Sequence, residues 1–137
     1  MLSSTLIFLF LFGISFSDIL IVPDNYSSIQ EAINLSSSGD TVKVNPGIYY
    51  ENLIIDEKFL LIKSIGSNEE TIIDGNYQAP VITCNNIING QMIIDGFTIK
   101  NGVGENINGS SFGGGILSKK SKLFLKNLVV ANNSAFA

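Results

Sequence analysis

The feature that most constrains this chain is a succession of short apolar runs that begins after residue 40 and continues almost to the C-terminus. The runs are rich in Ile, Val, Leu and Phe and are bounded by Gly, Asn or Asp, which is typical of β-strands joined by tight turns. Helical periodicity is lacking after residue 40, so the pattern argues against βαβ units and predicts an all-β fold. The predicted strands cover residues 42–44, 53–55, 59–65, 71–73, 81–84, 92–94, 97–99, 116–117 and 123–130.

The apolar runs also repeat along the chain. Ile54-Ile55-Asp56, Ile72-Ile73-Asp74 and Ile93-Ile94-Asp95 share one pattern, at successive offsets of 18 and 21. A period of roughly 20 residues with several strands in each period is typical of a solenoid, whose stacked coils bury a face that one coil cannot bury alone. Stacked strands lie about 4.8 Å apart. We therefore expect ladders of like residues, with Ile73 over Ile94 and Asp74 over Asp95.

A second repeat is longer. Residues 92–102 (MIIDGFTIKNG) align with residues 123–133 (LFLKNLVVANN) at an offset of 31, which matches Asn101 with Asn132. The glycine-rich residues 102–115 lengthen this repeat. We expect them to form a loop that projects from the stack, where a binding function could be placed.

A short amphipathic helix is predicted at residues 28–35. Ser28 followed by Glu31 forms a capping box, and Ile29 and Ile33 fall on one apolar face. Two turns of helix are unstable alone in water, so this face must rest on another element. We expect the helix to cover the open end of the first coil, where strand edges would otherwise be unpaired.

The N-terminus has the features of a secretory signal. Residues 6–14 form an apolar run far shorter than the ~20 residues that span a bilayer, and Ser15 and Ser17 have the small-x-small spacing of a signal peptidase site. We predict a signal peptide at residues 1–17, cleavage after Ser17, and a secreted or cell-surface chain of residues 18–137 without a transmembrane segment. A buried N-terminal strand and an uncleaved anchor are the alternatives. In a secretory route four N-x-S/T sequons are candidate glycosylation sites: Asn25, Asn34, Asn108 and Asn132.

Composition excludes several classes of function. The chain has no Arg, His or Trp, and its 8 lysines face 12 acidic residues, which gives a net charge of -4. The cationic clusters that neutralise nucleic-acid phosphates are lacking, so no nucleic-acid partner is expected. His-dependent acid–base chemistry, a Ser-His-Asp triad and zinc sites built on His or paired Cys are excluded, and no cofactor or metal is expected. The single cysteine, Cys84, lies in an apolar run and is predicted to be a buried thiol, with an intermolecular disulfide as the alternative.

Two stretches of the chain resemble known β-helix proteins. IQEAIN (29–34) and GDTVKVNPGIYYENLII (39–55) resemble the opening of secreted, right-handed parallel β-helix proteins of the pectin lyase-like superfamily, in particular its pectinesterase-like members. This likeness covers roughly residues 20–100. Residues 113–134 are similar, more loosely, to the GG-x-I and F-x-x-N repeats of polymorphic outer-membrane and autotransporter-like β-helices. The resemblance implies a right-handed parallel β-helix, and the repeats account for about four coils.

The activity of that superfamily does not carry over residue by residue. Pectinesterases use two Asp, Gln residues and an Arg around the site, and pectate lyases typically use acidic calcium ligands and a basic residue, usually Arg. This chain has no Arg, and no run in it matches either catalytic signature. We therefore assign no catalytic residue from the sequence.

Two groups of residues remain as candidates for surface contacts. Tyr49, Tyr50 and Glu51 suit a sugar-facing patch, since aromatic faces and carboxylates match carbohydrate hydroxyls; alternatively, the tyrosines pack on the first coil and Glu51 is solvated. Asp74 and Asp95, if stacked, suit a carboxylate pair that divides acid and base roles or binds calcium. We favour the simpler interpretation that each Asp begins an Asp-Gly turn.

Two functions are consistent with these observations. The first is a secreted or cell-surface module with a structural, adhesive or glycan-contacting role, whose partner is an extracellular polysaccharide or a cell-surface component. The alternative is the N-terminal part of a pectinesterase-like or polysaccharide lyase-like carbohydrate-active enzyme. The sequence ends directly after a strand repeat, so we expect it to be a truncated part of a longer β-helix, which would leave one end of the stack bare.

Overall fold

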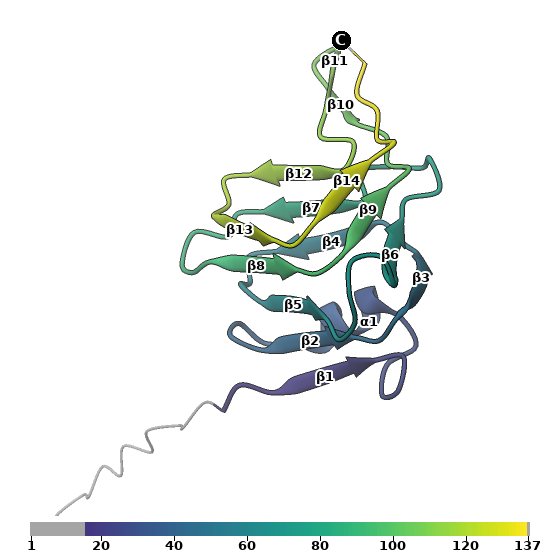
Figure 1. Cartoon of the computed structure of the whole chain (residues 1–137). Coiled ribbons are helices and arrows are strands. Elements are labelled where there is room, and N and C mark those ends of the chain that lie inside the picture. Colours follow the sequence, from purple (N-terminus) through teal and green to yellow (C-terminus); the bar gives the residue numbers. More distant parts are fainter. Residues whose placement is uncertain (1–15, 137) are drawn as a thin grey trace, which may run out of the picture.

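The computed structural model describes residues 16–136. It is a parallel β-helix, in which the chain winds coil upon coil through three parallel sheets (Figure 1). The predicted all-β solenoid with one short helix is confirmed. Residues 1–15 of the predicted signal peptide lie outside the described residues, so signal cleavage stays a prediction.

Three parallel sheets run along the axis of the described solenoid. Sheet A has the strand order β1 (Ile19–Val22), β2 (Thr41–Val44), β5 (Leu61–Ser64), β8 (Met92–Asp95) and β13 (Leu123–Lys126). Sheet B contains β3 (Gly47–Tyr50), β6 (Thr71–Asp74), β9 (Thr98–Lys100) and β14 (Val129–Ala131). Sheet C contains β4 (Leu53–Asp56), β7 (Ile82–Asn85) and β12 (Ile116–Lys119). The first coil is β2, β3 and β4, the second is β5, β6 and β7, the third is β8, β9 and β12, and the fourth is β13 and β14.

Strands β1 and β3 lie outside the ranges predicted from the sequence. β1 begins at Ile19, two residues after the last residue of the predicted signal peptide, whose apolar character obscured it. β3 begins at Gly47, where the Asn45-Pro46-Gly47 run indicated a turn. Both strands form because a neighbouring coil supplies parallel partners, β2 for β1 and β6 for β3.

The space between the sheets is filled by the side chains that point inward at every second position of each strand. Val42, Ile62 and Ile94 stack in register on sheet A and are at most 1% exposed. Phe97, at the corner between β8 and β9, is also fully buried. Burial of one such side chain stabilises the fold by about 1.5–3 kcal/mol, so these ladders are the main source of stability.

The register between coils differs from the predicted one. The three Ile-Ile-Asp segments lie in three different sheets, because they belong to β4, β6 and β8. Ile73 and Asp74 pair with residues of β3 and β9, whereas Ile94 and Asp95 pair with residues of β5 and β13. The predicted ladders of Ile73 over Ile94 and Asp74 over Asp95 are therefore wrong. They failed because strands of all three sheets share the same inward aliphatic pattern.

The coils lengthen along the chain, which is why one constant period does not describe them. Thr41 pairs with Leu61 at an offset of 20, whereas Ile82 pairs with Ile116 at an offset of 34. The solenoid strands stay short throughout, as β2, β9 and β12 illustrate. The added residues therefore lie in the corners between sheets.

The predicted offset of 31 near the C-terminus is confirmed. β13 lies on β8 and β14 lies on β9 in that register. The predicted single strand at 123–130 is divided at Asn127, whose φ of 49° is left-handed and turns the chain from sheet A to sheet B. Asn tolerates this backbone region better than most residues do.

Helix α1 (Ile29–Leu35) packs against β1, β2 and β4, and so covers the first coil as predicted. Its N-cap is Ser28, whose Oγ accepts a hydrogen bond from the backbone N–H of Glu31 at 3.1 Å. The capping box differs in one contact, because the Glu31 carboxylate accepts bonds from the N–H and Oγ of Ser27. The apolar residues of the helix are buried against the first coil: Ile29, Ala32 and Ile33.

Charged side chains of the first coil hold both ends of α1. The Glu51 carboxylate accepts hydrogen bonds from the first two backbone N–H groups of the helix, at 3.0 and 2.9 Å. The Lys58 ammonium donates to the carbonyl oxygens of Ile33 and Ser36, at 3.0 and 2.9 Å. A carboxylate at the N-terminus and an ammonium at the C-terminus both match the helix dipole, so each contact stabilises the docked helix.

The side-chain amide of Gln30 extends the hydrogen-bond ladder of sheet C below β4. Its Oε1 accepts a bond from the N–H of Ile54 at 2.8 Å, and its Nε2 donates to the carbonyl oxygen of Ile54 at 3.0 Å. An edge strand exposes backbone groups that can pair with another chain. Gln30 satisfies both groups of Ile54, and the helix thereby closes part of this edge.

The insertion between β9 and β12 forms an antiparallel hairpin. β10 (Glu105–Ile107) pairs with β11 (Ser110–Phe112) through a tight turn at Asn108 and Gly109, which both have positive φ. Figure 1 shows the hairpin projecting beyond the stack, as predicted for residues 102–115.

The C-terminal end of the described stack is open. Leu125 and Val130 are 47% and 53% exposed, whereas Ile94 and Ile99, on which they stack, are 0% exposed. The inward side chains of the fourth coil are thus aliphatic, like those of the coils before it. Among the described residues, a neighbouring coil covers them on one side and none covers the other.

Candidate functional site

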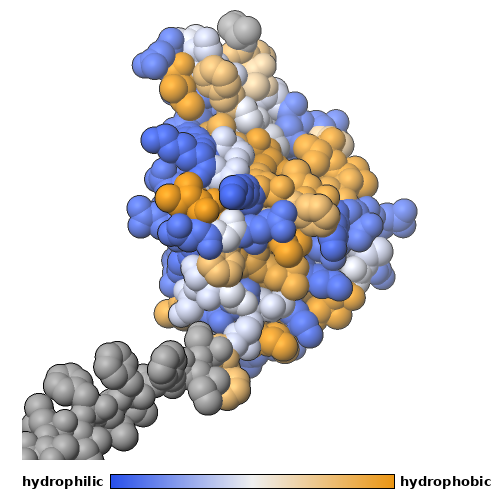
Figure 2. Space-filling view, turned by 90° about the vertical axis from the view of Figure 1, so that its left-hand side faces the viewer, coloured by the Kyte–Doolittle hydropathy of each residue, from blue (hydrophilic) through white to orange (hydrophobic). Residues whose placement is uncertain are grey.

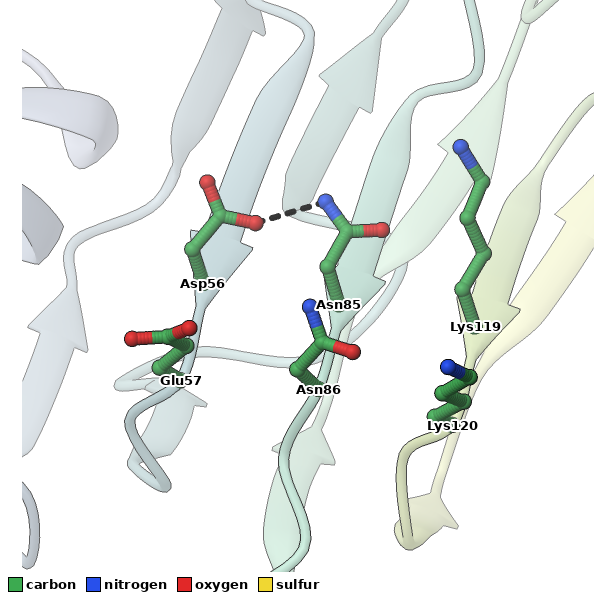
Figure 3. Close-up of a pocket in the computed structure, with 6 residues that line it drawn as sticks. All are labelled: Asp56, Glu57, Asn85, Asn86, Lys119 and Lys120. Atoms are coloured by element: carbon green, nitrogen blue, oxygen red, sulfur yellow. Dashed lines mark hydrogen bonds between the residues drawn. The ribbon is translucent and has the colours of Figure 1, made fainter.

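A polar groove with a volume of about 600 Å³ crosses sheet C where strands β4, β7 and β12 end. Asp56, Asn85 and Lys119 are the last residues of these strands and lie in register. A second polar residue follows each of them and completes the lining (Figure 3): Glu57, Asn86 and Lys120. Figure 2 views the side of the molecule toward which β7 and β12 run, and shows hydrophilic residues there beside a hydrophobic area.

The second residue of each pair has a left-handed backbone. The φ angles of Glu57, Asn86 and Lys120 are 58°, 54° and 49°. Asn adopts this region readily, whereas Glu and Lys do so at a cost on the order of 1–2 kcal/mol. The stack imposes the same corner on each coil, so all three pairs of polar side chains lie at one edge of sheet C (Figure 3).

The groove changes from acidic to neutral to basic along the axis of the solenoid. The first coil supplies two carboxylates, the second supplies two amides and the third supplies two ammonium groups. Adjacent coils are about 4.8 Å apart, so the carboxylates and ammonium groups are separated by about 10 Å, close to the distance at which salt screens exposed charges. The opposite charges therefore neutralise each other only weakly. Glu57 and Lys120 stay available to a ligand, whereas Lys119 is paired with Glu105 of the hairpin.

Asn85 has an unpaired acceptor at the centre of the groove. Its Nδ2 donates to Asp56 Oδ1 at 2.6 Å, and because a carboxylate can only accept, this bond sets the orientation of the amide. The Asn85 Oδ1 atom then faces the third coil (Figure 3) and is buried with no hydrogen-bond donor among the described residues. Lys119, the next residue of the ladder, directs its Nζ to Glu105 of the hairpin at 2.5 Å. A buried acceptor gains from a donor, so a ligand hydroxyl or N–H that reaches this atom through a shift of the neighbouring side chains would complete its pairing.

The chemistry of the groove is that of a binding surface for a polyhydroxylated ligand. Carboxylates accept, amides both accept and donate, and ammonium groups donate, so the lining can match hydroxyls that do both. No cluster of three or more His, Cys, Asp or Glu residues suited to hold a metal ion occurs between residues 16 and 136.

Tyr49, Tyr50 and Glu51 do not form the sugar-facing patch considered from the sequence. Tyr49 packs against the core and its Oη donates to the carbonyl oxygen of Asn45 at 2.9 Å, whereas Tyr50 is 68% exposed. Successive strand residues point to opposite faces, which separates the two rings. Glu51 is engaged by α1 and is not the solvated residue that the alternative required. Burial, followed by the nearby carboxylates of Glu51 and Asp24, raises the pKa of Tyr49.

Asp74 and Asp95 also have separate environments. Asp74 accepts a bond from the N–H of Asn76 at 2.9 Å, which is the turn that the sequence favoured, and another from Asn101 Nδ2 at 2.9 Å. Asp95 accepts from Asn127 Nδ2 in the next coil at 2.8 Å. The two carboxylates lie in different sheets, so the carboxylate pair considered from the sequence is not formed.

The four sequon asparagines, Asn25, Asn34, Asn108 and Asn132, are all exposed. The sequon at Asn34 differs from the others, because the Ser36 side chain is buried and its Oγ donates to the carbonyl oxygen of Ile33 at 2.7 Å. Asn108 lies at the tip of the projecting hairpin. Glycan attachment at any of these residues stays a prediction.

Cys84 is a free, fully buried thiol on the inward face of β7. Burial, with a smaller contribution from the Asp56 carboxylate, raises its pKa to about 12. The thiolate is the reactive form of cysteine. Cys84 is therefore a packing residue at neutral pH, as the sequence predicted.

The groove itself was not predicted, although the sequence contains its signal. Residues 53–57 (LIIDE), 82–86 (ITCNN) and 116–120 (ILSKK) each combine a short apolar run with two polar residues. They align at successive offsets of 29 and 34. Because these offsets are unequal, a search for one constant period does not bring the three pairs together.

No protein-family model and no curated protein sequence matches this chain. No helix among the described residues has the length and apolar character needed to cross a membrane.

Proposed function

We propose that this chain is a secreted or cell-surface β-helix module of the pectin lyase-like type, and that it contacts glycans through the polar groove on sheet C. The observation that carries the proposal is the in-register ladder of Asp56, Asn85 and Lys119, with the unpaired Oδ1 of Asn85 at its centre. The ladder offers an acceptor, a mixed group and a donor in successive coils.

A linear polysaccharide is the ligand that fits this surface best. The residues that line the groove follow one another across three coils, so the groove runs along the stack and a linear polymer can lie along it. Its six lining residues include no aromatic ring, so binding rests on hydrogen bonds and charge. Net contributions of about 0.5–1.5 kcal/mol for each hydrogen bond give a dissociation constant on the order of 1 mM for three or four bonds.

Secretion belongs to the same proposal. It is supported by the apolar run at residues 6–14, by the small residues Ser15 and Ser17, and by the start of β1 at Ile19. The four sequons would then meet the glycosylation machinery. A structural or adhesive role at a cell surface is consistent with a module that binds a polymer weakly and repeatedly.

The test is a titration of the purified chain with neutral and uronic-acid oligosaccharides, followed by NMR chemical shifts. We expect millimolar binding to at least one class, and at least a fivefold weaker affinity for Asn85→Ala and Asp56→Ala. Asn127→Ala is the matched control, because Asn127 bonds Asp95 as Asn85 bonds Asp56 but lies outside this groove. Equal affinities for Asn85→Ala and Asn127→Ala would show that the groove does not bind the ligand.

The alternative is a carbohydrate-active enzyme of pectinesterase or lyase type, of which this chain is the N-terminal part. Carboxylates and lysines in one groove are the observation that favours it. Incubation with pectin, with assays for released methanol and for unsaturated products, distinguishes the two. Turnover that Asp56→Asn abolishes would favour the enzyme, whereas binding without turnover favours the module.

A further inference from the structure

The carboxylate of Asp40 is buried beside the first described strand, and it accepts its hydrogen bonds from neutral backbone N–H groups. Asp40 is 5% exposed; its Oδ1 accepts a bond from the backbone N–H of Asp18 at 2.9 Å and its Oδ2 accepts from the N–H of Ser37 at 2.7 Å. No lysine of the described chain forms an ion pair with it. Burial of a carboxylate without a positive partner is costly.

We propose that proteolytic cleavage after Ser17 supplies this partner, because it converts the Asp18 N–H into an α-ammonium group that forms an ion pair with Asp40. The proposal rests on the secretion included in the proposed function, but not on the glycan groove. It identifies the Ser17–Asp18 bond as a processing site whose product is stabilised by the fold.

The contacts on either side of this bond agree with a cut at this position. On its C-terminal side, the Asp18 carbonyl oxygen accepts a bond from Thr41 N at 2.9 Å, which is the start of the pairing between β1 and β2. On its N-terminal side, Ser17 Oγ donates to the carbonyl oxygen of Gly39 at 2.7 Å in an exposed position, and Phe16 is 76% exposed. Of the described residues, cleavage therefore removes Phe16 and Ser17, with one exposed hydrogen bond and no buried side chain.

The proposed cleavage position is specific, because a cut one residue earlier or later would not form the ion pair. A cut before Ser17 would leave a neutral amide at Asp18, and a cut after Asp18 would remove both the donor to Asp40 and the acceptor for Thr41. Only a cut between Ser17 and Asp18 places the new positive charge on the atom that already lies 2.9 Å from the carboxylate.

The chemistry is hydrolysis of one peptide bond by the peptidase of the secretory route. Water adds to the Ser17 carbonyl carbon, the bond from this carbon to Asp18 N breaks, and Ser17 leaves as a carboxylic acid that ionises. Asp18 N takes up protons and is an ammonium group at neutral pH, since α-amino groups have a pKa of about 7.7–8.0. The hydrogen bond to the Asp40 carboxylate then has opposite charges on its two partners, and their Coulombic attraction adds to the bond.

The experiment begins with the full 137-residue chain expressed in a secreting host. The intact mass of the protein in the medium identifies its N-terminus, which we expect to be Asp18. Cyanate at near-neutral pH then carbamylates the α-amine in preference to lysine, because the α-amine has the lower pKa. Urea unfolding before and after this reaction is compared for the natural chain and for Asp40→Asn.

We expect carbamylation to raise the unfolding equilibrium constant of the natural chain about tenfold, and that of Asp40→Asn less than twofold. Equal effects on the two proteins, or an N-terminus at another residue, would overturn the inference. If Asp40→Asn does not fold, the natural chain still provides the test, because its α-amine should react with cyanate at least fivefold more slowly when folded than in urea. Equal rates would also overturn it. Glycan titration of the same sample distinguishes this failure from failure of the groove.

Discussion

The two ends of the described stack solve the same problem in different ways. At the N-terminal end, α1 covers the first coil, and Glu51, Lys58 and Gln30 join the helix to that coil through hydrogen bonds. At the C-terminal end, the inward residues Leu125 and Val130 remain about half exposed. Both ends have aliphatic residues at equivalent inward positions. Their different exposure indicates that the presence of a covering element, more than the type of residue, determines how much the inward side chains of a coil contribute to stability.

The largest expected effect compares an inner rung with the outermost one. Ile94→Ala should lower the free energy of unfolding by about 2–5 kcal/mol, because it leaves a cavity among fully buried side chains. Leu125→Ala, one rung above on the same ladder, should cost less than half as much, because this side chain is already half exposed. Urea unfolding measures both. Equal losses would mean that the C-terminal end is covered in solution.

The N-terminal end of the stack can be destabilised by removing the Glu51 carboxylate that binds α1. Glu51→Ala should lower the free energy of unfolding by about 1.5–3 kcal/mol, because two helical N–H groups lose a charged acceptor. Glu51→Gln should recover part of this loss. The control is Glu57→Ala, a glutamate of the same coil that lies in the exposed groove, with an expected change within about 0.5 kcal/mol. A similar loss for both variants would contradict the capping role.

The middle of the stack, between the two ends, can be tested through Cys84. Its pKa of about 12 in the folded chain exceeds its ordinary value of 9.0, so folding favours the protonated thiol. The resulting stability is complete below pH 9 and is lost as the pH rises toward 12, with about 1.4 kcal/mol lost by pH 10. Tyr49 adds a loss of the same sign, because its pKa is also raised. The difference between the natural chain and Cys84→Ala in alkaline urea unfolding isolates the thiol; parallel curves would show that water reaches this rung.

The smallest effect concerns the other end of the helix. Lys58→Met keeps the aliphatic stem but removes the ammonium from the carbonyl oxygens at the end of α1, and should cost about 1 kcal/mol. Lys43→Met, on the outer face of β2, is the matched control and should change stability by less than about 0.5 kcal/mol. Thermal unfolding is sensitive enough to separate them. If Lys58→Met behaves as the control does, the closed end depends on Glu51 and apolar packing alone.

Local patterns predicted what local interactions determine. A capped helix with one apolar face was predicted from Ser28, Ile29 and Ile33. The structure confirms that this face packs on the first coil. The recurrence of short apolar runs about 20 residues apart predicted a solenoid, because one coil cannot bury its apolar face alone. The repeat at an offset of 31 also predicted the register of the last two coils. It did so because no insertion separates β8 from β9 or β13 from β14.

The errors in register have one physical origin, which is that corners vary in length while strands do not. Asp74 and Asp95 were matched because their strands look alike, although the strands belong to different sheets. Glu51 was interpreted as a surface residue because its helical partners, Ile29 and Gln30, lie about one coil earlier in the chain. The groove around Asn85 depends on the register of three coils, which no single stretch of sequence reveals.

The hairpin β10–β11 departs from the third coil and returns to it between β9 and β12, and it contacts the segment after β14, where the Ser111 N–H donates to the carbonyl oxygen of Phe136. Its turn at Asn108 and Gly109 lies beyond these contacts, so the length of this turn is independent of the spacing that the spiral enforces elsewhere. Descendants of such a chain can gain or lose residues at this place while every interior contact stays as it was. Sequence and length differences between related chains are thus expected to accumulate in the corners and loops, while the residues of the buried interior change slowly.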